Sequence, residues 1–107
     1  MNIRIVIKGV AEPGELREYA EEKISTALDR FADRITSVTV RLEDAPGARR
    51  PHAEKQCSID TRMKSSGEIV IKEHSEDLQS ALLTALDRLK AAVSRKAGKM
   101  KRGIGRG

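Results

Sequence analysis

The sequence predicts an α+β fold. It is a two-layer sandwich in the order β-α-β-β-β-α, with a four-stranded mixed sheet and two parallel helices packed on one face. Four short segments alternate apolar and polar residues, as strands with one buried face do. Two longer segments carry apolar residues at the spacing of a helical stripe. Because the connections are short, each element is expected to run back against the preceding one, which makes the first two strands parallel and the two helices parallel.

The first strand is predicted over residues 3–8, where isoleucine occupies every second position. Pro13 and Gly14 then form a turn that can start a helix, since proline is favoured near the first helical position. The first helix is predicted over Glu15–Asp33, on a stripe of apolar residues: Leu16, Ala20, Ile24, Ala27, Leu28 and Phe31.

Three further alternating segments predict strands over Ile35–Glu43, Lys55–Lys64 and Glu68–His74. Ala45–Ala53 holds two prolines and a glycine and is predicted to be a loop, while Ser65-Ser66-Gly67 is predicted to be a hairpin turn. Ser75 is expected to cap a second helix, whose apolar stripe continues to about Lys96. Residues 1–97 are thus predicted to form a single α+β domain, and residues 98–107 a flexible basic Gly/Arg tail.

Charge is distributed unevenly along the chain. The last twenty residues contain eight Lys or Arg and no Asp or Glu, whereas the preceding 87 contain the other thirteen basic and all sixteen acidic residues. A body of net charge −3 therefore carries a terminal segment of +8. Such a block suits a polyanion such as RNA, DNA or an anionic membrane surface, although a solvated, frayed tail would have the same composition.

At about 100° per residue, basic residues gather in one arc on each helix. The arc on the second helix holds Arg88, Arg95, Lys99 and Arg102, and the arc on the first holds Lys23, Arg30 and Arg34. Because the helices are expected to be parallel, both basic ends should lie at the same end of the domain and could follow phosphate strands. Complementing the helix dipole is the simpler explanation for Arg34 and for one or two of residues 95–99.

The outward face of the sheet is expected to be charged and to lack aromatic rings. It would carry Arg4, Lys8, Arg41, Arg62, Lys64 and Lys72, with Glu43 and Asp60. Sheets that read single strands stack bases on exposed aromatics, so contacts to phosphate and sugar are expected instead. Four residues near the predicted loop, Arg49, Arg50, His52 and Lys55, are either a second contact or a solvated loop.

No catalytic or metal-binding constellation, and no cofactor, is predicted. His52 and His74 lack a second ligand at suitable spacing. Cys57 is expected to be buried on the core face of its strand. A single cysteine, no secretory leader and no apolar run of about 20 residues lead us to expect a cytoplasmic, non-enzymatic protein without a membrane span.

Several runs of residues carry a resemblance over about residues 3–101. They are Leu16-Arg17-Glu18-Tyr19 with Lys23, Phe31-x-Asp33-Arg34-Ile35, Asp77-Leu78 with Ala81, and Ala85-Leu86-Asp87-Arg88-Leu89 followed by basic residues. In combination they resemble the bacterial ribosome hibernation factors, the hibernation-promoting factor and ribosome-associated inhibitor family, in its short form. The predicted fold is also similar to a double-stranded-RNA-binding domain.

The resemblance implies a ribosome hibernation factor that binds the rRNA of the small ribosomal subunit in the mRNA and tRNA decoding channel and inhibits translation in stationary phase or stress. It also implies a protein that is monomeric when free and has no small-molecule substrate. Basic positions of the family match Arg17, Lys23, Arg88, Arg95, Lys99 and Lys101. Helical geometry adds Arg30, Arg34, Lys96 and Arg102 as rRNA-binding residues.

The chain also departs from the family pattern. Gln79 stands where members often have an aromatic residue, and the Arg49-Arg50 loop and the Gly-Arg tail differ from the best-known members, which indicates a divergent branch. Pairing of dormant ribosomes and inactivation of single ribosomes both remain open. Two other functions are alternatives: a general RNA- or DNA-binding module acting away from the ribosome, and a protein-interaction domain whose basic end binds an acidic partner.

Overall fold

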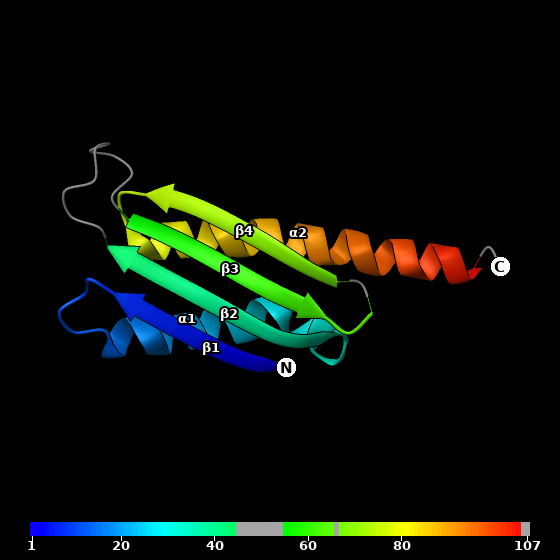
Figure 1. The fold of residues 1–107 in the computed structure, drawn as a ribbon, viewed down its shortest axis with the longest axis horizontal. Helices are drawn as coiled ribbons and strands as arrows, with labels where there is room; N and C mark the ends of the chain where they lie inside the picture. Colours follow the sequence, from blue (N-terminus) through cyan, green and yellow to red (C-terminus); the bar gives the residue numbers. More distant parts are fainter. Residues whose placement is uncertain (45–54, 66, 106–107) are drawn as a thin grey trace.

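The computed structural model describes residues 1–44, 55–65 and 67–105, with side chains described as far as residue 96. The predicted element order is present, with an additional 3-10 helix before the second strand (Figure 1). The elements are β1 (Asn2–Lys8), α1 (Gly14–Leu28), η1 (Asp29–Arg34), β2 (Ile35–Asp44), β3 (Lys55–Met63), β4 (Gly67–Ser75) and α2 (Leu78–Gly105). The predicted fold class is confirmed.

The four strands form one mixed sheet in the order β1-β2-β3-β4. β1 is parallel to β2, and the other neighbouring pairs are antiparallel. Both helices lie on the same side of the sheet and run in the same direction, behind the strands in Figure 1. The sheet therefore has an inner face beneath the helices and an outer face without a helix.

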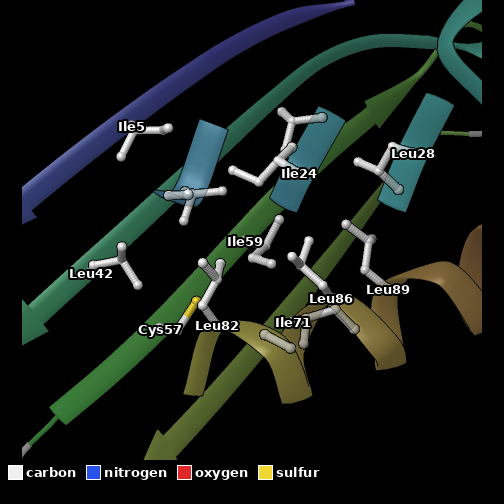
Figure 2. Close-up of a cluster of buried hydrophobic side chains, with 14 of the residues drawn as sticks. Ile5, Ile24, Leu28, Leu42, Cys57, Ile59, Ile71, Leu82, Leu86 and Leu89 are labelled. Carbon is white, nitrogen blue, oxygen red and sulfur yellow. The ribbon is translucent and has the colours of Figure 1, made fainter. Parts of the chain in front are cut away.

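The core lies between the inner face and the two helices (Figure 2). Alternate residues of the central strands are fully buried there, among them Val40 in β2 and Ile59 in β3. The helices contribute Ile24, Leu82 and Leu89, each 0 % exposed. Thr61 is the one buried polar residue recorded in the described part of the chain. Side-chain directions repeat every two residues in a strand and every 3.6 residues in a helix. In each element this period places the apolar side chains on the side that faces the core.

β2 begins with a bulge that the alternation alone did not reveal. The register between β2 and β3 shifts between Ile35 and Ser37, so the extra residue there is Thr36. Both Ile35 and Val38 are consequently buried, although they are an odd number of residues apart. An extra residue in one strand moves the following side chains to the other face, which explains how both point inward.

The ends of the helices differ from the predictions in three places. The first helical segment, predicted as one helix to Asp33, changes at Asp29 from α1 to the tighter η1. α2 begins at Leu78, and its N-cap is Asp77 rather than Ser75, because Asp77 Oδ2 accepts a hydrogen bond of 3.2 Å from the backbone N–H of Ser80.

The third difference is the length of α2. It continues to Gly105, past the predicted end near Lys96, so residues 98–105 have helical backbone where a flexible tail was expected. Apolar spacing ends earlier than the helix because these last turns have no sheet beneath them. Residues 99–102 are good helix formers without packing, whereas the three glycines of this segment are poor ones. Arg106 and Gly107 lie outside the described residues.

Replacing Gly9 by alanine should destabilise the protein much more than the same change at Gly67. Both glycines have positive φ, 78° and 79°, so both substitutions incur backbone strain of about 1–2 kcal/mol. Only at Gly9 would the new Cβ also meet the Asp44 carbonyl oxygen, at 2.1 Å, whereas nothing lies within 4 Å at Gly67. Urea denaturation of both variants measures the difference, and equal losses of unfolding free energy would contradict the close approach.

The thiol of Cys57 should be unreactive in the folded protein. Burial, and next the negative charge of Glu73, raise the pKa of Cys57 from 9.0 to about 12. A thiol reagent at neutral pH should therefore modify the protein only as fast as it unfolds, and immediately in denaturant. Below pH 9 the thiol is protonated in both states, so it adds no pH dependence. Between about pH 9 and 12 it ionises only in the unfolded chain, and the unfolding free energy should fall more steeply than in Cys57→Ala.

Candidate nucleic-acid interface

The C-terminal ends of both helical segments lie at the same end of the domain, as the predicted parallel arrangement requires (Figure 1). α2 has 28 residues and is about 42 Å long, whereas the longest strand has ten residues and spans about 33 Å. The last turns of α2 therefore extend beyond the sheet. We call this region the basic end, after the described cations there: Arg30, Arg34, Lys64, Arg95 and Lys96.

Two cations of the first helical segment lie over aromatic rings. Lys23 Nζ is 5.5 Å from the centre of the Tyr19 ring, and Arg30 Cζ is 5.3 Å from that of Phe31. Both rings are partly buried and pack against the core. Because a cation over a ring face is attracted to it, the fold holds Lys23 and Arg30 in position before any partner binds.

The arc predicted for Lys23, Arg30 and Arg34 assumed a continuous α-helix and is wrong at its far end. η1 turns by about 120° per residue instead of about 100°, so over its six residues the direction shifts by roughly 120°. On this ideal geometry Arg30 stays near the line of Lys23, whereas Arg34 is displaced from it. Arg34 remains a predicted RNA-binding residue, on a different side of the first helical segment.

The turn after β3 joins the end of η1. The backbone N–H of Lys64 donates a hydrogen bond of 3.0 Å to the carbonyl oxygen of Arg34. Lys64, which we predicted only as part of the outward sheet face, is thereby brought to the basic end and is exposed there. Sequence reasoning missed this neighbour because 30 positions separate it from Arg34 and only the folded sheet brings them together.

Arg17 and Arg88 both bind the edges of the sheet. Arg17 Nη1 donates to the Ile5 carbonyl of edge strand β1 at 2.7 Å. Arg88 Nη1 donates to the Lys72 carbonyl of the other edge strand, β4, at 3.1 Å and pairs with Glu73. Edge strands present carbonyls that no further strand pairs, so each arginine ties a helix to one open edge. Both side chains remain partly exposed, and their other N–H groups can still face a partner.

The remaining predicted cations lie along α2 and in the loop. Arg95 and Lys96 border a hollow of about 360 Å³ beside Ile69 and Ala92, with Glu68 at its rim. Lys99, Lys101 and Arg102 have helical backbone on the projecting turns, and their side chains are not described. Lys55 forms an ion pair of 3.2 Å with Asp44. Arg49, Arg50 and His52 lie outside the described residues.

The described residues offer neither a metal site nor a membrane-spanning helix. Among residues 1–44, 55–65 and 67–105, no group of three or more His, Cys, Asp or Glu side chains could hold a metal ion. Within the same ranges, neither helix has a window long and apolar enough to span a membrane. The basic end is the most prominent charged surface of the described residues. Its positive charge suits a polyanionic partner.

Comparison with known proteins gives the family. The model for the family described as Sigma 54 modulation protein / S30EA ribosomal protein matches residues 3–101. The chain therefore belongs to this family of ribosome-associated proteins, and the resemblance stated above is confirmed. Among curated proteins, none matches the chain.

Two solved structures show the same fold. The N-terminal domain of Protein Y from Thermus thermophilus is 28% identical, with a TM-score of 0.70, over 89% of this chain and 98% of that one. A ribosomal subunit interface protein from Coxiella burnetii is 19% identical, with a TM-score of 0.71, over 92% of this chain and 99% of the other. At the second identity, the likeness concerns the fold alone.

Removing the Arg88 side chain should loosen α2 from β4. Arg88→Ala loses the hydrogen bond to the Lys72 carbonyl and the ion pair with Glu73. Because the side chain is 54% exposed, solvent screens the pair, and we expect a loss of about 1 kcal/mol of unfolding free energy. Lys90→Ala, on the same helix and exposed, is the control and should cost much less. Equal losses in urea denaturation would show that the edge contact adds no stability.

Proposed function

We propose that this protein binds the RNA of the small ribosomal subunit in the channel used by mRNA and tRNA, and inhibits translation there in stationary phase or stress. The observation that carries the proposal is the basic end, where cations from η1, the β3–β4 turn and α2 lie together. Five described cations from three separate segments form this extended surface. Complementing a helix dipole would account for only one or two of them.

Family membership supports the ribosome as the partner. The family is described as containing an S30EA ribosomal protein, and its model covers nearly the whole chain. A ribosome offers a continuous surface of phosphates, and the basic end offers cations to pair with them.

The chemistry of the contact follows from the residue types. Arg30, Arg34 and Arg95 can each bind a phosphate with two N–H groups, and Lys64 acts as a point charge. Tyr19 and Phe31 are partly buried, so they do not form an open platform on which bases stack. Binding should therefore depend on the positions of phosphates and on the shape of the RNA rather than on base sequence.

In this proposal the protein acts by occupying its site and has no catalytic step. It needs no cofactor, is monomeric when free, and works in the cytoplasm, where ribosomes are. The proposed rRNA-binding residues remain those predicted: Arg17, Lys23, Arg30, Arg34, Arg88, Arg95, Lys96, Lys99, Lys101 and Arg102. Lys64 joins them because of its hydrogen bond to Arg34.

Reversing three charges of the basic end should release the protein from ribosomes. Arg30→Glu/Arg34→Glu/Arg95→Glu changes exposed residues outside the core, so folding should be retained. Sedimentation through sucrose gradients at low and moderate salt should show the wild type with the small subunit and with intact ribosomes, and the variant at the top. Losing three phosphate contacts should also lower the slope of log affinity against log salt by about 2 to 3.

A single charge reversal elsewhere on α2 gives the control. Lys90→Glu is exposed and lies about 200° around the helix from Arg88, so ribosome binding should be nearly unchanged. A triple variant that folds and still sediments with ribosomes would refute docking through the basic end. Equal binding to both subunits and to random duplex RNA would instead indicate a general RNA-binding module.

A further inference from the structure

The outer face of the sheet carries a polar hollow that the proposed function does not use. It has a volume of about 240 Å³ and lies over β2 and β3, on the side away from the helices. Three successive cross-strand pairs form it: Ser37 with Arg62, Thr39 with Asp60, and Arg41 with Ser58. Its walls therefore present three hydroxyls, two guanidinium groups and one carboxylate.

The charges in this hollow alternate. The Cα atoms of Arg62 and Arg41 are about 14 Å apart, from about 3.4 Å per residue along a strand and about 4.8 Å between strands. Asp60 belongs to the pair between them. Both arginines are exposed, and within the described residues neither forms an ion pair, although Glu68 of β4 is the cross-strand neighbour of Arg62. Two sites for an anion thus flank one site that repels anions.

Asp60 needs a hydrogen-bond donor. Its Oδ1 is shielded from water and has no hydrogen-bond partner among the described residues. A carboxylate oxygen without a donor is costly. Asp60 is half-buried and lines the hollow, so a ligand hydroxyl in the hollow gains affinity when this carboxylate turns to accept from it. An ionised phosphate has no proton to donate, whereas a ribose hydroxyl has one. Asp60 therefore favours a sugar hydroxyl, between phosphates held by Arg41 and Arg62.

The neighbouring residue on β4 suits a sugar as well. Val70 pairs with Asp60 across the strands, lines the hollow and is 49% exposed. An aliphatic side chain can pack against the carbon face of a ribose ring. None of the four strands contains Phe, Tyr or Trp, and His74 of β4 does not line the hollow, so bases would not be stacked there. The hollow is thus complementary to sugar and phosphate rather than to bases.

We infer that this hollow is a second RNA-binding site, which takes the sugar–phosphate backbone of a single RNA strand and distinguishes RNA from DNA through Asp60. Phosphates lie at Arg41 and Arg62, and a 2′-hydroxyl donates to Asp60. This surface is on the opposite side of the sheet from the helices. The protein therefore contacts two RNA segments, one at the basic end and one on the outer face.

Binding of two short strands that differ only in the 2′-hydroxyl tests the inference. Oligouridylate and oligodeoxyuridylate of about twelve nucleotides are suitable, because single-strand-binding domains cover lengths of this order. At low salt, fluorescence anisotropy should show the RNA strand bound roughly tenfold to a hundredfold more tightly, as one hydrogen bond to a carboxylate allows. Equal affinities for the two strands in the wild type would overturn the inference.

Two variants and a control separate the roles of the residues. Asp60→Ala should abolish the preference for RNA while raising affinity for the DNA strand, because a repelling charge is removed. Arg41→Ala/Arg62→Ala should weaken both strands and lower the salt slope by about 1.4. Lys8→Ala/Lys90→Ala removes as much charge outside the hollow. An unchanged preference in Asp60→Ala, or equal effects of the two double variants, would refute the site.

The result is independent of ribosome docking. Arg30→Glu/Arg34→Glu/Arg95→Glu should keep the preference for RNA over DNA even where it no longer sediments with ribosomes, since none of these residues lines the hollow. Circular dichroism establishes that each variant is folded. Loss of the preference in this folded triple variant would place the discrimination at the basic end and overturn the inference.

Discussion

Burial of the inner sheet face is the constraint on which the arrangement depends. Residues at the centre of this face, such as Val40 and Ile59, are 0 % exposed, and burying each is worth about 1.5–3 kcal/mol. One helix is too narrow to cover a four-stranded sheet, so both helices must lie on the same side. The short connections make them parallel, and their C-terminal ends therefore meet at one end of the domain.

The same covering layer also protects the two edges of the sheet. Each helix extends one arginine to a carbonyl of the nearest edge strand, Arg17 to β1 and Arg88 to β4. Both arginines are among the proposed rRNA-binding residues, yet part of each guanidinium group is used within the fold. An arginine has five donors, so stabilising an edge and binding a phosphate are compatible. Effects of changing them on RNA binding would include an effect on stability.

Covering one face of the sheet leaves the other free, and this outer face differs in chemistry from the basic end. The basic end combines cations from three segments and offers little besides positive charge. The outer face instead alternates guanidinium groups with a carboxylate and hydroxyls, in a hollow about as wide as two strands. A protein with cations at one end and on the outer sheet face is suited to a space with RNA on more than one wall.

The sequence by itself determined the order of the strands and the two main helices, the inward face of each strand except at the Ile35 bulge, and the parallel helices. Alternation and helical stripes are local patterns. The apolar side chains in these patterns are the same ones that the fold buries. The sequence also determined the +8 terminal segment and the family resemblance. Beyond Lys96 no sheet packs against α2, and the helix continues through residues that lack the apolar stripe.

Only the tertiary structure decided which cations lie together. The change to η1 turns Arg34 away from Lys23, and the bond from Lys64 to Arg34 joins residues far apart in the chain. The partners of Arg17 and Arg88, and the hollow around Asp60, likewise depend on register between strands. Such contacts are not readable from local periodicity, because they depend on where separate elements meet rather than on which face each element buries.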